Sequence, residues 1–119
     1  MTNTNVKENI KSATINRTAN YDQTLVNEVI NLIDTATPDF SKAFTITLSI
    51  RGTYAYMGYK TIAIATANTY EEANQLYKEL KKKFKNICDY KTKISFSFAT
   101  TRALTTPSSL TSNWAYKAY

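Results

Sequence analysis

The sequence contains no histidine, and this absence removes much of the chemistry that proteins perform at neutral pH. Histidine is the usual general base, the usual partner of serine and cysteine nucleophiles, and a frequent zinc ligand. The chain has only two glycines, and the glycine-rich motifs that cradle phosphates are missing. Its one adjacent pair of acids, Glu71-Glu72, suits the start of a helix. We therefore expect a protein that is not an enzyme, with no metal site and no cofactor.

Cysteine and long apolar runs are also scarce. Cys88 is the only cysteine, so no disulfide forms within the chain, which is typical of proteins from a reducing compartment. We expect its thiol to be inert. No apolar run approaches the roughly 18 residues of a membrane span, and the polar residues 1–12 do not resemble a secretory signal. These features predict a cytoplasmic protein that does not contact membranes.

The length and composition are those of one folded domain. The chain has 119 residues, of which 43% are hydrophobic and 20% charged, as is usual for a globular protein. We divide it into a loose segment (1–11), a single α+β domain (12–104) and a C-terminal loop with an aromatic tail (105–119).

Two segments have the periodicity of amphipathic helices. Apolar side chains recur every three or four residues over 21–36 and again over 69–87. The residues at 20–23 resemble a capping box, and those at 69–72 form another. Both segments are therefore predicted to be helices with one apolar face.

Three segments alternate between apolar and polar residues, as strands do. These are 12–18, 43–50 and 91–100. The pair Arg51-Gly52 is a plausible hairpin turn, after which a fourth strand beginning at residue 53 pairs with 43–50 and sets Tyr59 opposite Phe44. A shift in the alternation beyond Gly58 indicates either a bulge or a second turn there.

The resulting order is β-α-β-β-α-β. We expect an α+β two-layer sandwich, in which two helices cover one face of an antiparallel sheet, and ferredoxin-like topology is its specific form. Without a strand at 12–18 the class is still α+β.

The charge is uneven along the chain. The net charge is +6; residues 1–59 hold five basic and five acidic side chains, whereas residues 60–119 hold ten and four. Within the second helix four lysines recur at helical spacing, namely Lys78, Lys81, Lys82 and Lys85. Such a one-sided positive field favours polyanions, although a lysine row is also typical of a solvated helix face.

The uncovered face of the sheet is a second candidate surface for nucleic acid. Its expected side chains are Thr45, Thr47, Ser49, Tyr54, Tyr56, Lys91, Lys93, Ser95 and Ser97. Tyrosines beside lysines on a sheet stack bases and hold phosphates. The alternatives are a plain polar face and a dimer interface. Residues 51–59 share part of the RNP1 pattern of RNA-recognition motifs, but Thr53 is an extra residue and no RNP2 partner is visible, so we assign no family.

The favoured function is nucleic-acid binding. The residues expected to carry it are Lys78, Lys81, Lys82, Lys85, Lys91, Lys93, Arg51, Tyr54 and Tyr56. The alternative is a protein-binding regulator or inhibitor, such as a viral or mobile-element accessory protein. Its interface would use Trp114, Tyr116 and Tyr119, against this domain, a second copy in a homodimer, or another protein. The first hypothesis requires that the lysines stay together and are not paired with acids.

Overall fold

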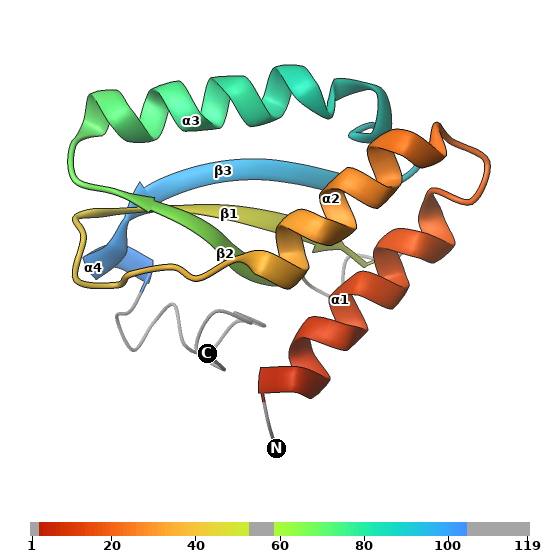
Figure 1. Ribbon diagram of the computed structural model, residues 1–119, viewed down its shortest axis with the longest axis horizontal. Coiled ribbons are helices and arrows are strands. Elements are labelled where there is room, and N and C mark those ends of the chain that lie inside the picture. Colours follow the sequence, from red (N-terminus) through yellow and green to blue (C-terminus); the bar gives the residue numbers. More distant parts are fainter. Residues whose placement is uncertain (1–2, 53–58, 105–119) are drawn as a thin grey trace.

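The computed structural model describes residues 3–52 and 59–104. In chain order its elements are α1 (Asn3–Arg17), α2 (Gln23–Thr35), β1 (Phe44–Arg51), β2 (Tyr59–Ala67), α3 (Tyr70–Lys83), the 3-10 helix η2 (Lys85–Ile87), β3 (Ile94–Thr100) and α4 (Thr101–Leu104) (Figure 1).

The three strands form an antiparallel sheet in the order β2-β1-β3, so β1 is central. Helices α1, α2 and α3 pack against this sheet: α3 lies mainly over β3 and β1, while α1 and α2 contact β2 (Figure 1). The predicted α+β class is therefore confirmed. The ferredoxin-like order is not, because the chain begins with two helices where a strand and a helix were expected.

The prediction for the N-terminal residues was wrong. Residues 3–17 form α1, where we expected a loose segment followed by a strand over 12–18. Ile10, Thr14 and Thr18 recur at four-residue spacing and are fully buried. The Thr14 and Thr18 hydroxyls each donate to the carbonyl four residues earlier, at 2.8 and 2.6 Å. These bonds satisfy polar groups that would otherwise be costly to bury, so a segment with little apolar patterning still packs as a helix.

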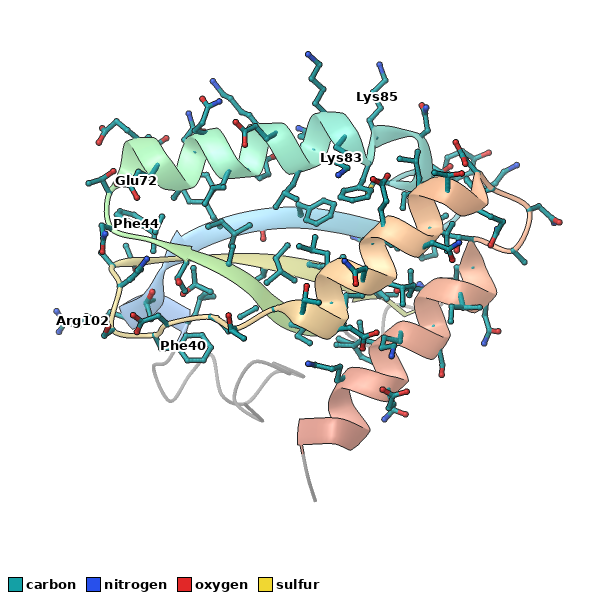
Figure 2. All side chains as sticks on the ribbon, viewed as in Figure 1. Phe40, Phe44, Glu72, Lys83, Lys85 and Arg102 are labelled. Carbon is teal, nitrogen blue, oxygen red and sulfur yellow. The ribbon has the colours of Figure 1, made fainter. Side chains whose placement is uncertain are left out.

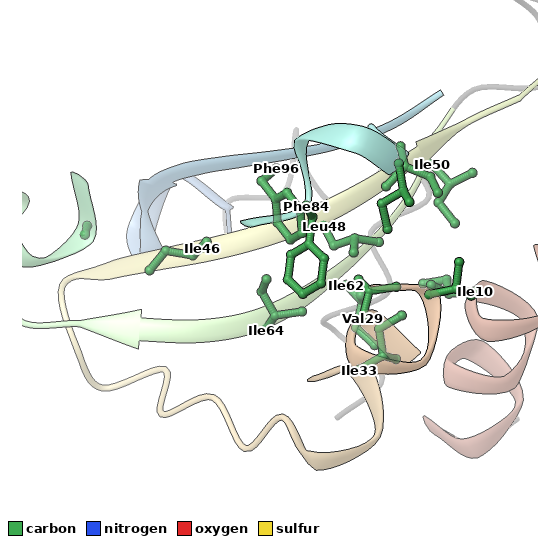
Figure 3. Close-up of a cluster of buried hydrophobic side chains, with 14 of the residues drawn as sticks. Ile10, Val29, Ile33, Ile46, Leu48, Ile50, Ile62, Ile64, Phe84 and Phe96 are labelled. Carbon is green, nitrogen blue, oxygen red and sulfur yellow. The ribbon is translucent and has the colours of Figure 1, made fainter. Parts of the chain in front are cut away.

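The helices and the sheet share one hydrophobic core (Figure 3). Ile10 of α1 and Val29 and Ile33 of α2 meet the sheet residues Leu48 and Ile62, all buried. At the α3 end of this core, the ring of Phe84 stacks on that of Phe96, with centroids 5.8 Å apart. Helix α1 is thus part of the folded core.

One of the two predicted helix caps is present. The Thr69 hydroxyl accepts a 3.2 Å hydrogen bond from the backbone N–H of Glu72, which confirms the start of α3. At α2 the cap is Asp22, whose carboxylate accepts from the Thr24 N–H at 2.9 Å. The predicted capping box at 20–23 is therefore wrong, because an aspartate one residue before the helix fills the same role.

The register between β1 and β2 also differs from the prediction. Tyr59 lies opposite Arg51, and Phe44 lies opposite Ala67. This register pairs β2 along the whole of β1 and places Ile62 beside Leu48 in the core. The register shifts between Ile46 and Thr47. The bulge or turn expected at Gly58 lies outside the described residues.

Candidate nucleic-acid interface

Helix α3 separates its charges along its length. Glu71 and Glu72 lie in its first turn, and lysines fill its last turn. Each sign of charge matches the end of the helix dipole that it faces. The helix therefore presents a cationic C-terminal half.

The four lysines predicted as a row lie around one groove. The groove has a volume of about 630 Å³ and lies between the C-terminal half of α3 and strand β3. Its cationic lining consists of Lys78, Lys81 and Lys82 of α3 and Lys85 at the start of η2. Its other lining residues come from α3, the end of η2 and the start of β3: Tyr77, Cys88, Ile94, Ser95 and Phe96.

These four lysines have no acidic partner among the residues that the structure describes. Their neighbour Lys83 points the other way: its Nζ lies 3.3 Å from Oε1 of Glu28 on α2. In Figure 2 Lys83 projects toward α2, whereas Lys85 projects away from the sheet. The packing of α2 thus pairs Lys83 with an acid and leaves Lys78, Lys81, Lys82 and Lys85 on the other side without one.

An aromatic surface adjoins the lysines. The Tyr77 ring packs 5.5 Å from that of Phe98, and the Nζ of Lys81 lies 5.5 Å from the Tyr77 ring centroid. Phe96 forms part of the groove and is itself braced by Phe84. A cation beside an aromatic face suits a ligand that has both an anionic backbone and flat rings.

A turn formed by residues 89–93 extends the site. Asp89 organises it: its carboxylate accepts from the N–H groups of Lys91 and Thr92, each at 2.9 Å, and from the Tyr21 hydroxyl at 2.8 Å. The pKa of the Asp89 carboxyl is lowered, chiefly by the hydrogen bond from the Thr92 N–H and also by the one from the Tyr21 hydroxyl. Burial acts in the opposite direction but is outweighed. The negative charge of Asp89 is therefore stabilised by hydrogen-bond donors within the protein.

The structure corrects the placement of Lys91 and Lys93. Both lie in this turn and not on β3, which begins at Ile94. Lys93 adopts a left-handed backbone conformation with φ of +58°, and its Nζ donates to the Tyr90 carbonyl at 3.3 Å. The Nζ of Lys91 lies 5.9 Å from the Tyr90 ring centroid.

A second groove of about 380 Å³ lies beside this turn. Its lining residues are Arg51, Cys88, Asp89, Tyr90, Lys93, Ile94 and Ser95. Arg17 of α1 holds the surrounding backbone, because its Nη1 donates to the carbonyls of Arg51 and Thr92. Sequence reasoning missed Arg17, Tyr77 and Tyr90. The alternation within 91–100 gave no sign that residues 89–93 form a turn. The usable signal in the sequence was Tyr90, which lies between the charged residues Asp89 and Lys91.

The predicted open sheet face is not open at its centre. Thr45 and Thr47 are buried. The Thr47 hydroxyl lies 3.0 Å from that of Ser97, and the Ser49 hydroxyl lies 3.0 Å from that of Thr61. These pairs satisfy one another across the strands, so the hydroxyls of the central strand β1 are not presented to a ligand.

The end of this face near α4 is covered as well. The Thr45 hydroxyl lies 2.7 Å from that of Thr101 in α4. Leu104 of α4 and Phe40 pack on Ala63 there, and both α4 and Phe40 lie on the side of the sheet opposite α3 (Figures 1 and 2). Of the hydroxyl residues predicted for this face, Ser95 and Ser97 on the outer strand β3 are exposed.

Cys88 lines both grooves. Burial, with a smaller contribution from the nearby Asp89 charge, raises the pKa of its thiol to about 11. The thiol is therefore protonated at neutral pH and is a poor nucleophile.

Five of the predicted site residues lie outside the described part of the chain, namely Tyr54, Tyr56, Trp114, Tyr116 and Tyr119. Across residues 3–52 and 59–104, no three histidine, cysteine, aspartate or glutamate side chains gather as a metal site requires. None of the helices described is both long and apolar enough to cross a membrane.

Comparison with known proteins gives no relative. No protein-family model, no curated protein and no solved structure is significantly similar to this chain. We therefore infer its function from the side chains that line the two grooves.

Proposed function

We propose that this chain is a non-catalytic nucleic-acid-binding protein whose lysines on α3 and at the start of η2 hold backbone phosphates. The observation that carries the proposal is the convergence of Lys78, Lys81, Lys82 and Lys85 on one groove, with no acidic partner among the described residues. Unpaired ammonium groups are available to phosphates, and neutralising phosphates releases the counterions that condense on a nucleic acid.

The distribution of charge supports the same proposal. The excess of positive charge comes entirely from residues 60–119, and most of their basic side chains lie on α3, on η2 and in the turn before β3. Glu71 and Glu72 lie at the other end of α3 and would repel a polyanion there. A phosphate chain would therefore be drawn to the C-terminal half of the helix.

The non-catalytic part of the proposal depends on the residues in the grooves. The sequence supplies no histidine, and the Cys88 thiol, with a pKa of about 11, is protonated. The Asp89 carboxylate already accepts three hydrogen bonds from within the protein. A poised general base or nucleophile would need a different environment.

The test is the salt dependence of binding by single-lysine variants. We would measure anisotropy of labelled DNA and RNA oligonucleotides between about 50 and 200 mM salt, and plot log K against log salt concentration. Lys82→Gln and Lys85→Gln should each reduce the slope by about 0.7 to 0.9, the value of one phosphate contact.

Lys83→Gln is the matched control. It removes the same charge from the same helix, but from the side that faces Glu28, so the slope should remain as in the unmodified protein. Binding that does not respond to salt, or equal losses in Lys83→Gln and Lys85→Gln, would show that the row does not form the site.

A further inference from the structure

The two grooves are parts of one track along β3. Cys88, Ile94 and Ser95 line both of them. One end of the track is bordered by the lysines of α3, and the other by Arg51 and Lys93. Positive side chains thus lie at both ends of the track, and the Asp89 carboxylate, which also lines the second groove, accepts hydrogen bonds from within the protein.

An exposed aromatic ring lies at the turn end of the track. Tyr90 lines the second groove and is 80% exposed. Such an exposed tyrosine contributes little to the core, and the cation of Lys91 lies at its ring. Tyr77 lies at the other end of the track, beside Lys81. Each end therefore pairs an aromatic ring with an ammonium group.

The strand that borders the track has a free edge. Within the described residues β3 pairs with β1 alone, so the backbone N–H and C=O groups on its other side have no strand partner. Ser95, at the point where the grooves join, is exposed. These backbone groups and the Ser95 hydroxyl can donate to and accept from polar atoms of a ligand that lies along the edge.

We infer that the nucleic acid is single-stranded, and that it runs along the β3 edge with its phosphates on the α3 lysines and a base stacked on Tyr90. The inference rests on the proposed function and narrows it. Bases inside a duplex are stacked on one another, so their faces cannot reach a tyrosine ring, whereas those of a single strand are available. A cationic groove with aromatic platforms is the usual architecture for single-strand binding with little sequence preference.

The experiment compares one labelled DNA sequence as a single strand and as a duplex, at the same salt concentration. The single strand should bind more tightly. Tyr90→Ala should weaken its binding about fivefold or more, which is the range for one stacked base, and Tyr90→Phe should retain most of the affinity because the ring remains. Because Tyr90 is exposed, neither variant should alter folding, which circular dichroism would verify.

Tyr70→Ala is the control for losing an exposed tyrosine. Tyr70 is 55% exposed at the acidic end of α3 and lines neither groove. Its loss should leave the affinity for the single strand unchanged.

The possible failures are distinguishable. Equal binding of duplex and single strand, with Tyr90→Ala unaffected and Lys85→Gln weakened, would overturn the single-strand inference and leave the proposed function. Polyglutamate carries negative charge but no bases. If polyglutamate at the same concentration of negative charges displaced the oligonucleotide as well as unlabelled single strand does, the track would bind charge alone, and the stacking model would be overturned. Absence of nucleic-acid binding at low salt would overturn both.

Discussion

The Tyr21 hydroxyl donates a 2.8 Å hydrogen bond to Oδ2 of Asp89, which lies 68 residues later in the chain. The bond joins the connection between α1 and α2 to the turn that precedes β3. The same carboxylate holds the N–H groups of Lys91 and Thr92. One acidic side chain thus fixes the turn that presents Tyr90 and Lys93 to the second groove.

This arrangement predicts how stability depends on pH. Its donors lower the pKa of the Asp89 carboxyl in the folded protein, so folding favours the ionised form. That contribution is complete above the unfolded-state pKa of about 4 and is lost as the pH falls through the lower folded value. Urea unfolding should therefore show stability falling more steeply with acidification in the unmodified protein than in Asp89→Asn.

The Asp39 carboxylate does not affect the comparison of the unmodified protein with Asp89→Asn. The pKa of Asp39 is also lowered, chiefly by a hydrogen bond from the Ser41 hydroxyl. Asp39 is present in both proteins, so its contribution cancels in the difference. Parallel stability curves for the unmodified protein and Asp89→Asn below pH 5 would contradict the role given to Asp89.

Removal of the Ile10 side chain tests whether α1 belongs to the core. Ile10 is fully buried, and truncating such a residue to alanine typically costs about 2 to 5 kcal/mol. The free energy of unfolding of Ile10→Ala should fall by this amount in urea titrations. Ile15→Ala, on the same helix but 50% exposed, should change it by less than about 1 kcal/mol. Equal effects would mean that α1 does not pack as described.

Removal of the α3 cap should destabilise the fold modestly. Thr69→Ala leaves the Glu72 N–H without its side-chain acceptor, and cap losses of this type cost about 1 kcal/mol. Thr24→Ala is the control: Thr24 follows the Asp22 cap, and its hydroxyl does not cap α2. Thermal unfolding monitored by circular dichroism would compare them, and a Thr69→Ala variant as stable as Thr24→Ala would rule out the cap.

The Cys88 thiol should react slowly in the folded protein. Its pKa is raised from 9.0 to about 11, which lowers the thiolate fraction about 100-fold at neutral pH, and the thiolate is the reactive form. Because a thiolate of higher pKa is also a stronger nucleophile, alkylation by iodoacetamide should be roughly 10- to 100-fold slower in buffer than in urea. The chain has no other cysteine, so the rate can be followed on the whole protein. Similar rates in the two conditions would show that the thiol is accessible and ionised.

Local patterns in the sequence predicted the elements that have strong periodicity. The apolar spacing over 21–36 and the alternation over 43–50 correspond to α2 and β1, and the single helix predicted over 69–87 is α3 followed, after Phe84, by the 3-10 helix η2. The spacing of Lys78, Lys81, Lys82 and Lys85 also brought them to one groove, three on α3 and Lys85 on η2, which follows it. Each of these features follows from the geometry of a single helix or strand, and neighbouring residues in the chain are enough to specify it.

Tertiary structure decided the features that depend on distant partners. Helix α1 has little apolar periodicity, and only its packing on α2 and the sheet makes it part of the core. The sequence could not show that Thr45 and Thr47 are buried, because cross-strand hydroxyl partners and α4 decide it.

The lysines illustrate the division best. Sequence alone determined that α3 ends in a cluster of positive charge. Whether a given lysine keeps that charge available depends on its neighbours: Lys83 pairs with Glu28 of α2, whereas Lys85 lies at the rim of the first groove and projects away from the sheet. An ion pair between residues 55 positions apart is set by how two helices pack, which helical periodicity within α3 does not encode.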